Sequence, residues 1–178
     1  MFLTRRLAPF AALLAAVLLG GCDKSQPADK PATAPLPEEL FLGAAPDDPR
    51  PIHELKQSTE PGDEVTVRAV IGGRVDPIVR GRASATIVDA EVNNTCLIGD
   101  DHCKTPWDYC CEPRERVTAN MATLQVVDAD GRVVEADLAS RLPPLSTVVA
   151  RGIVGPRPTS EALTINATGV YVETRGRP

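Results

Sequence analysis

The feature that most constrains the fold is an alternation of small apolar residues with polar ones along short segments beyond residue 62. In residues 65–71, every odd-numbered position is valine, alanine or isoleucine, and threonine and arginine lie among the positions between them. Successive side chains of a strand point to opposite faces, so this pattern predicts a strand with one buried face. Four further strands are predicted at residues 83–88, 122–127, 147–154 and 163–172.

Three local signals refine this pattern. The apolar positions of the last strand slip by one residue, which predicts a β-bulge near Gly169. The residues Asp-Ala-Asp-Gly at 128–131 predict a hairpin turn, because glycine supplies the positive φ that such turns need. Asp137 predicts the start of a single helical turn, which Pro143 ends.

Five strands with a helical turn between the third and fourth resemble the OB-fold, a small Greek-key barrel common among oligonucleotide and oligosaccharide binders. The segments that carry this resemblance are residues 62–69, 149–154 and 163–167. We therefore expect a mainly β protein, a small five-stranded OB-like Greek-key barrel with a long cysteine-rich loop between strands 2 and 3. Residues 103–131 are also similar to uncharacterised envelope lipoproteins with an OB-like domain, a resemblance that implies no activity.

The N-terminus has the parts of a signal peptide in order. Arg5 and Arg6 precede an apolar run at residues 7–19, which is shorter than the about 20 residues that span a bilayer as a helix. The following residues, Leu19-Gly20-Gly21-Cys22, resemble the lipobox of bacterial lipoproteins. The resemblance implies cleavage before Cys22 and attachment of lipid, palmitate-type acyl chains included, to that cysteine. A plain secretory signal with a chance cysteine is the alternative.

A lipid anchor defines the expected location and the first partner, which is the membrane itself. Each buried methylene contributes about 0.8 kcal/mol, so two or three acyl chains hold the protein permanently. We expect a lipid-anchored protein of the cell envelope that faces the periplasm. Asp23 resembles a signal for retention in the inner membrane, and the choice between inner and outer membrane stays open.

The chain divides into four predicted parts. Residues 1–21 are the signal peptide, and residues 22–50, rich in proline, alanine and acidic residues, are a lipidated disordered tether. Residues 51–61 form a short helix and a lead-in, because Pro61 and Gly62 end the amphipathic stretch. The OB-like barrel occupies residues 62–175.

The charge balance argues against nucleic acid as a partner. Without residues 1–21 the chain carries 17 basic and 24 acidic side chains, and residues 62–178 contain no phenylalanine. Binders of single-stranded nucleic acid stack bases on aromatic side chains along a cationic groove. An OB-fold nucleic-acid binder therefore remains only a disfavoured second alternative.

Four cysteines form the most informative cluster, namely Cys96, Cys103, Cys110 and Cys111. In an oxidising compartment an even number of thiols predicts disulfides. A bond between the adjacent pair would strain the intervening peptide, so two pairings stay open. In one, Cys96 pairs with Cys110 and Cys103 with Cys111; in the other, Cys96 pairs with Cys111 and Cys103 with Cys110. Each bond would stabilise the fold by about 2–4 kcal/mol.

The alternative is a metal-binding or thiol-redox site, although the first expectation is no cofactor. His102 lies beside Cys103, and thiolates with imidazole suit zinc or copper. The ligand set would be Cys96, His102, Cys103, Cys110 and Cys111. The cysteine spacing differs from the closely spaced pairs of most structural zinc sites, and the redox motif Cys-x-x-Cys is absent from the sequence.

Two aromatic residues, Trp107 and Tyr109, lie within the cysteine-rich loop. The favoured interpretation is a small core covering the disulfides. The alternative is an exposed pair that contacts a protein or glycan partner.

The sequence lacks the motifs of common enzymes. Gln57 occupies the position where a zinc-protease helix that begins at His53 needs its second histidine, and no Gly-x-Ser-x-Gly motif is present. We therefore expect a non-catalytic binding or structural module that presents residues 91–120 to an unknown envelope protein or glycan.

Overall fold

The structure, a computed structural model, describes residues 35–98 and 103–177. The predicted signal peptide, the lipobox cysteine Cys22 and His102 lie outside the described residues. Within the described residues, no helix is long and apolar enough to cross a membrane.

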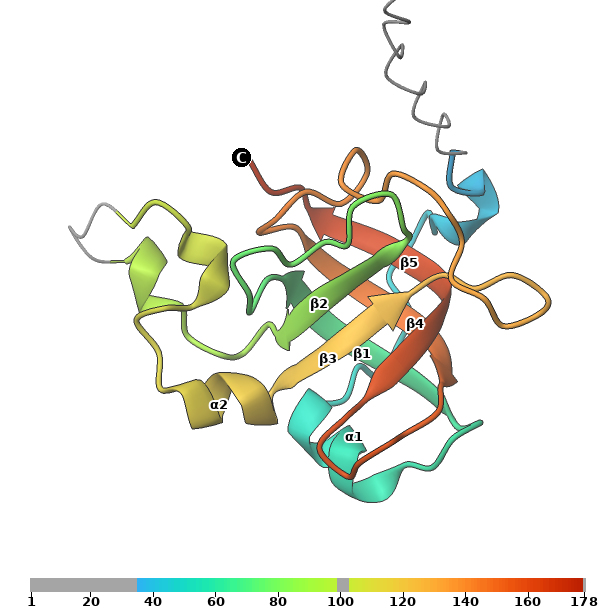
Figure 1. The fold of residues 1–178 in the computed structure, drawn as a ribbon, viewed down its shortest axis with the longest axis horizontal. Helices are drawn as coiled ribbons and strands as arrows, with labels where there is room; N and C mark the ends of the chain where they lie inside the picture. Colours follow the sequence, from blue (N-terminus) through green and yellow to red (C-terminus); the bar gives the residue numbers. More distant parts are fainter. Residues whose placement is uncertain (1–34, 99–102, 178) are drawn as a thin grey trace, which may run out of the picture. The chain divides into compact units, whose positions relative to one another are not determined.

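Five strands form a closed barrel, which confirms the predicted fold class (Figure 1). They are β1 (Glu64–Ile71), β2 (Ser84–Asp89), β3 (Met121–Gln125), β4 (Thr147–Val154) and β5 (Thr164–Thr174). The order around the barrel is β1-β2-β3-β5-β4, and β4 pairs with β1 to close it. The pairing of β3 with β5 is parallel, whereas the other pairings are antiparallel.

The barrel core consists of aliphatic side chains. Along β1 the burial alternates as the sequence predicts, and Val67, Ala69 and Ile71 are fully buried. Ile87 and Ile165 also have no exposed surface. Alanines from several strands fill the remaining interior positions, so a narrow barrel closes without aromatic residues.

The predicted bulge lies in β5 opposite β4. Arg151 pairs with Gly169 and Gly152 pairs with Ala167, so Thr168 is the extra residue. A Cβ atom on Gly152 would lie 2.3 Å from the carbonyl oxygen of Asn166. Only glycine permits this close approach of the two strands.

The segment before α1 differs from the predicted tether. Residues 36–42, which we call the N-terminal strap, pack on the barrel and contain η1 (Glu38–Leu40). Leu36 and Leu40 belong to the barrel core, and the backbone of Phe41 bridges to Val170 of β5. Residues 36–42 of the predicted tether therefore pack on the barrel, because the apolar side chains spaced among the prolines contact it.

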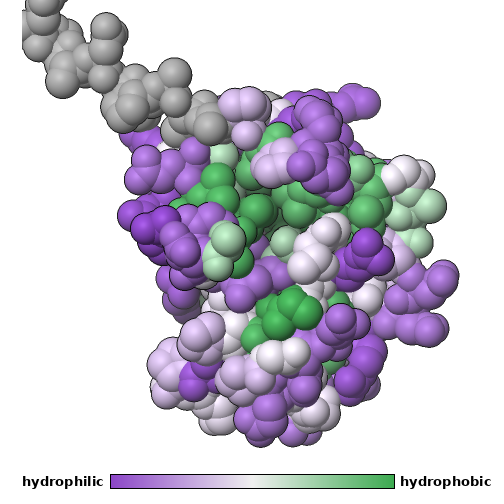
Figure 2. Space-filling model, turned by 90° about the vertical axis from the view of Figure 1, so that its right-hand side faces the viewer, coloured by the Kyte–Doolittle hydropathy of each residue, from purple (hydrophilic) through white to green (hydrophobic). Residues whose placement is uncertain are grey.

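The short helix α1 (Ile52–Ser58) lies where the sequence predicts one, and buries Ile52 and Leu55 in the same core. Figure 2 shows one face of the molecule, on which hydrophobic residues gather with hydrophilic ones around them. The exposed large apolar side chains of the described part all lie in connections and are Val75, Val79, Leu97 and Ile98.

Candidate metal centre

The connection between β2 and β3 carries the four cysteines and packs on the outer face of the barrel. It contains η2 (Thr95–Leu97), η3 (Pro106–Asp108) and α2 (Arg114–Ala119). A second apolar core holds it in place, formed by Val88, Val92, Tyr109 and Val117 with Met121 beside them. Successive side chains of β2 point to opposite faces, so Ile87 enters the barrel core and Val88 enters this second core.

Tyr109 sets the direction of the chain at the cysteines. Its φ of 58° lies in the left-handed region, which is an outlier for a bulky residue and costs about 1–3 kcal/mol. Burial of its ring in the second core offsets this cost, because the side chain is only 3% exposed. The next two residues, Cys110 and Cys111, are exposed on the outside of the connection.

A close contact between backbones fixes the connection to the barrel. The amide of Gly73 donates to the carbonyl oxygen of Trp107 at 2.7 Å. A Cβ atom on Gly72 would lie 2.6 Å from that oxygen and 3.1 Å from the ring of Tyr109. Glycine at position 72 is therefore required for this approach.

Two side chains join the early and late parts of the connection. The buried Glu112 carboxylate accepts hydrogen bonds from the amide of Thr95 at 3.0 Å and from its hydroxyl at 2.8 Å. These hydrogen bonds hold the pKa of Glu112 below its ordinary value. The side-chain amide of Asn94 donates to the carbonyl oxygen of Pro106 at 2.7 Å. Both braces bring the Cys96 segment next to the segment that carries Cys110.

The aromatic pair does not form an exposed contact surface. Tyr109 is buried, with only 3% of its surface exposed. Burial, followed by the charges of Asp89 and Glu112, raises the pKa of Tyr109 to about 12. Trp107 is partly exposed and its indole N–H donates to the carbonyl oxygen of Val75 at 2.8 Å. Tyr109 belongs to the second apolar core, whereas Trp107 is not among the residues of that core.

The four sulfur atoms lie together around Cys110. Its Sγ lies 3.4 Å from that of Cys103, 3.6 Å from that of Cys96 and 3.8 Å from that of Cys111. All four of these cysteines are free, so the predicted disulfides are not present in the structure. The three separations of 3.4–3.8 Å exceed the about 2.05 Å of a disulfide bond.

These separations fit tetrahedral coordination of a metal ion. Zinc binds thiolates at about 2.3 Å, so the sulfurs at the corners of a regular tetrahedron lie about 3.8 Å apart. Cys96 is buried, Cys103 is partly exposed, and the other two cysteines are exposed. The ion would thus sit between a buried ligand and the solvent-facing side of the connection.

Asp108 is a competing ligand for the fourth position. One of its oxygens lies within 4.8 Å of the sulfurs of Cys96, Cys103 and Cys110. However, Oδ1 accepts the amide of Cys110 at 2.8 Å, and Oδ2 accepts the hydroxyl of Thr105 at 2.9 Å. The ligand atoms that all lie within 4.8 Å of one another include that of Asp108 and not that of Cys111. Because hydrogen bonds engage both Asp108 oxygens, we infer that Asp108 orients the loop and that Cys111, whose Sγ lies 3.8 Å from that of Cys110, is the fourth ligand.

The thiols influence each other's ionisation. Burial raises the pKa of Cys96, but hydrogen bonds from Cys111, Cys110 and Cys103 outweigh it, and the net shift is downward. The pKa of Cys110 is raised, first by its hydrogen bond with Cys103, and that of Cys111 is raised, first by its hydrogen bond with Cys96. The cluster therefore holds one thiolate readily, and further thiolates require a cation to balance their charge.

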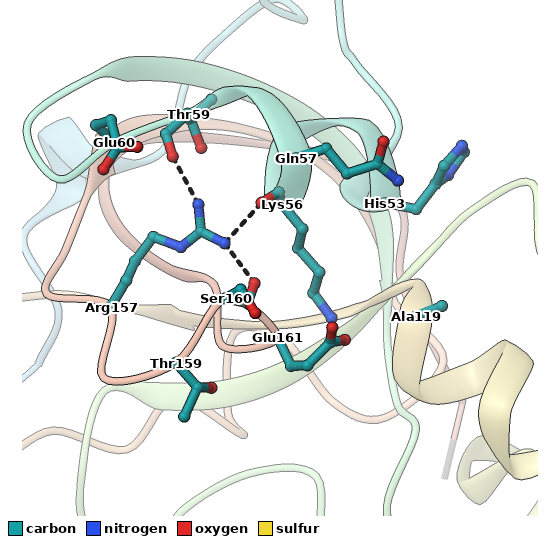
Figure 3. Close-up of a pocket in the computed structure, with 10 residues that line it drawn as sticks. All are labelled: His53, Lys56, Gln57, Thr59, Glu60, Ala119, Arg157, Thr159, Ser160 and Glu161. Carbon is teal, nitrogen blue, oxygen red and sulfur yellow. Dashed lines mark hydrogen bonds between the residues drawn. The ribbon is translucent and has the colours of Figure 1, made fainter.

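A polar hollow of about 700 Å³ beside α1 is the second candidate site (Figure 3). Arg157 points toward the end of α1, where its guanidinium donates to the carbonyl oxygens of Lys56 at 2.7 Å and Thr59 at 2.6 Å. The Lys56 ammonium donates to the carbonyl oxygen of Thr118 at 2.7 Å, and burial lowers its pKa. Since both cations are engaged by backbone carbonyls, this hollow is a structural clasp between α1, α2 and the β4–β5 connection.

Comparison with known proteins gives no relative on which to base a function: no protein family, curated protein or solved structure matches this chain.

Proposed function

We propose that this protein is a lipid-anchored protein of the bacterial envelope whose barrel carries a structural metal centre. The ligands are Cys96, Cys103, Cys110 and Cys111, and zinc is the ion that fits best. The observation that carries this proposal is the set of three sulfur separations of 3.4–3.8 Å around Cys110. Tetrahedral sulfur-only sites favour zinc, or iron as a chemical competitor, over octahedral metals.

The role that fits this centre is to brace the β2–β3 connection. All four ligands belong to one connection, and a closed set of four protein ligands is typical of structural rather than catalytic zinc. Metal binding would add a cross-link between segments that short helices, a small apolar core and a few hydrogen bonds hold. A rigid connection of this kind suits the presentation of its outer surface to an envelope protein or glycan.

The lipid anchor is supported by sequence alone. The paired arginines, the apolar run and the residues Leu19-Gly20-Gly21-Cys22 are in the order that lipoproteins show. Lipidation turns the Cys22 thiol into a thioether, so the mature protein keeps four thiols for the metal. The test is the N-terminal mass, with Cys22→Ala as the variant that abolishes both acylation and cleavage.

The metal is tested on the full chain, purified in detergent without chelators. We expect one zinc ion per chain by elemental mass spectrometry, and an intact mass that does not change on reduction. Replacement of zinc by Co²⁺ should give thiolate-to-metal charge transfer and the intense visible bands of tetrahedral coordination. A metal-free protein whose mass is lower by four hydrogens, restored on reduction, would establish two disulfides and overturn the proposal.

Variants of the ligands sharpen this test. Cys111→Ser should weaken metal binding at least tenfold, because it removes a ligand and not only a supporting contact. Asp108→Asn is the matched control and should retain one metal ion per chain. Retention of full affinity by Cys111→Ser with loss in Asp108→Asn would exchange the roles assigned to these two residues.

A further inference from the structure

The four thiols differ in their access to solvent. Cys96 is only 6% exposed, Cys103 is partly exposed, and Cys110 and Cys111 are exposed. Cys110 also lines a hollow of about 590 Å³ together with Arg74, Arg114 and Met121. A small solute can therefore reach the sulfur of Cys110, which is also the sulfur that lies close to all three others.

From this arrangement we infer that Cys110 is a site of oxidation by hydroperoxides and that Cys103 is its resolving thiol. The inference rests on the proposed metal centre, because oxidation of these two ligands would release the ion. Of the three sulfurs near that of Cys110, the sulfur of Cys103 is the nearest, at 3.4 Å. A shift of little more than 1 Å brings them to the length of a disulfide bond.

The reaction balances with hydrogen peroxide as the oxidant. Cys110, deprotonated as a ligand of the metal, attacks one peroxide oxygen with its sulfur, the O–O bond breaks, and hydroxide leaves as the sulfur becomes a sulfenic acid. The Cys103 thiolate then attacks the Cys110 sulfur, an S–S bond forms, and the second hydroxide leaves. Two sulfurs lose two electrons in total, and two protons convert the hydroxides to two water molecules. The metal ion departs with its oxidation state unchanged, since two of its four ligands are gone.

The other two cysteines are poorer resolving thiols. The sulfur of Cys96 is buried and lies 3.6 Å from that of Cys110. Cys111 is the next residue in the chain and lies 3.8 Å away, and a bond between adjacent cysteines strains the peptide that joins them. A bond from Cys103 closes a short loop within the connection and leaves the second apolar core in place.

The experiment titrates the metal-loaded full chain with hydrogen peroxide. A chromophoric chelator records the released metal, and an alkylating reagent then blocks the remaining thiols. Trypsin cuts after Lys104, and an endoprotease that cuts before aspartate separates Cys96 from Cys103 at Asp100 and Asp101. Mass spectrometry of the fragments therefore distinguishes a Cys103–Cys110 bond from a Cys96–Cys110 bond. The Cys111→Ser variant resolves the assignment between the two adjacent cysteines.

We expect one metal ion to be released and two thiols to be lost for each peroxide molecule consumed, with the Cys103–Cys110 bond as the main product. In Cys103→Ser the bond should be missing, and a dimedone adduct should mark a persistent sulfenic acid at Cys110. Release of metal with a bond to Cys96, or retention of metal and four thiols in excess peroxide, would overturn the inference.

The same titration on metal-free protein separates this inference from the proposed function. If the chain binds no metal but still forms the Cys103–Cys110 bond, the metal centre is wrong and the oxidation site stands. If the chain binds metal and this bond does not form, only the oxidation site is wrong.

Discussion

The barrel and the β2–β3 connection share strand β2 but are stabilised in different ways. The barrel core draws buried aliphatic side chains from all five strands, α1 and the N-terminal strap. The connection has a second core of four buried residues, one of which is the strained Tyr109. Its remaining support comes from hydrogen bonds such as those of Glu112 to Thr95, and from the proposed metal.

The difference shows how a barrel can position a segment that has only a small apolar core of its own. Ile87 and Val88 are neighbours in sequence, yet one supports the fold and the other supports the candidate site. Damage to the barrel should therefore lower the stability of the whole molecule, whereas damage to the connection should change metal binding and leave the barrel folded.

The largest effect is expected from Ile87→Ala. Loss of a fully buried isoleucine should lower the free energy of unfolding by about 2–5 kcal/mol, because a cavity remains in the barrel core. Val88→Ala is the matched variant on the opposite face, with an expected loss of about 2 kcal/mol and a weaker metal affinity. Chemical denaturation and metal titration of both variants provide the measurement. Equal effects of the two variants on metal affinity would show that the cores are not independent.

A smaller effect is expected from Gly72→Ala, which tests the contact between the two regions. The new Cβ atom would meet the carbonyl oxygen of Trp107 at 2.6 Å, so the connection must move away from the barrel. Overpacking of this kind costs about 1–3 kcal/mol. Competition with a chromophoric chelator should show weaker metal binding, while circular dichroism reports an intact barrel. Gly43→Ala is the control, because no atom lies near the added Cβ.

The same contrast explains what sequence reasoning predicts well. The five strands follow from a two-residue alternation that each segment carries by itself, and the slip in the last strand predicts the bulge opposite Arg151 and Gly152. Sequence reasoning does not predict the packing of the strap, because prolines and acidic residues dominate the composition of this region. Leu36 and Leu40 are too widely spaced there to form a recognisable pattern, although the barrel surface binds both.

Sequence reasoning names the cysteines of the candidate site and considers both disulfides and a metal ion, but it does not give the arrangement of the sulfurs. The cysteines stand out by their number, yet their arrangement depends on contacts between distant residues. Glu112 accepts a hydrogen bond from Thr95, which is 17 residues away in the sequence. Tyr109 adopts a left-handed conformation that no local sequence motif predicts. The compartment argument favours disulfides, whereas the three-fold proximity of Cys110 favours a metal ion.

A modest decrease in metal affinity is expected from Asp108→Asn, which tests the contribution of the hydrogen bonds within the loop. The amide oxygen can still accept the hydrogen bond from the amide of Cys110, but the charged acceptor for the Thr105 hydroxyl is lost. One such hydrogen bond contributes about 0.5–1.5 kcal/mol, which corresponds to about a 2- to 10-fold weaker metal affinity. Thr105→Val should reproduce the loss. A complete loss of metal in Asp108→Asn, but not in Thr105→Val, would instead make the carboxylate a ligand.

The smallest effect is expected at the strap, far from the metal. The Glu38 carboxylate accepts hydrogen bonds from Arg141 at 2.6 and 3.2 Å, and the guanidinium lies 4.0 Å from the centroid of the Phe41 ring. The hydrogen bond to Arg141, and then its charge, hold the pKa of Glu38 below its ordinary value of 4.5. A carboxyl group whose pKa is lowered in the folded state stabilises that state at pH values above the ordinary pKa. This contribution is lost as the pH falls through the lowered pKa.

Hydrogen exchange of metal-free protein tests this prediction, because acid would also strip the metal. The amides of the strap should be better protected in the native chain than in Glu38→Gln at neutral pH. The difference should begin to fall as the pH drops below 4.5, and should vanish once the pH is below the lowered pKa of Glu38. Solvent screens an exposed ion pair, so the change should stay local and leave the amides of β5 unaffected. If the difference in amide protection between the native chain and Glu38→Gln persists unchanged in acid, Glu38 stabilises the strap through the packing of its side chain and not through its charge. Loss of protection in β5 at the same pH would mean that the strap is as integral to the barrel as the strands are.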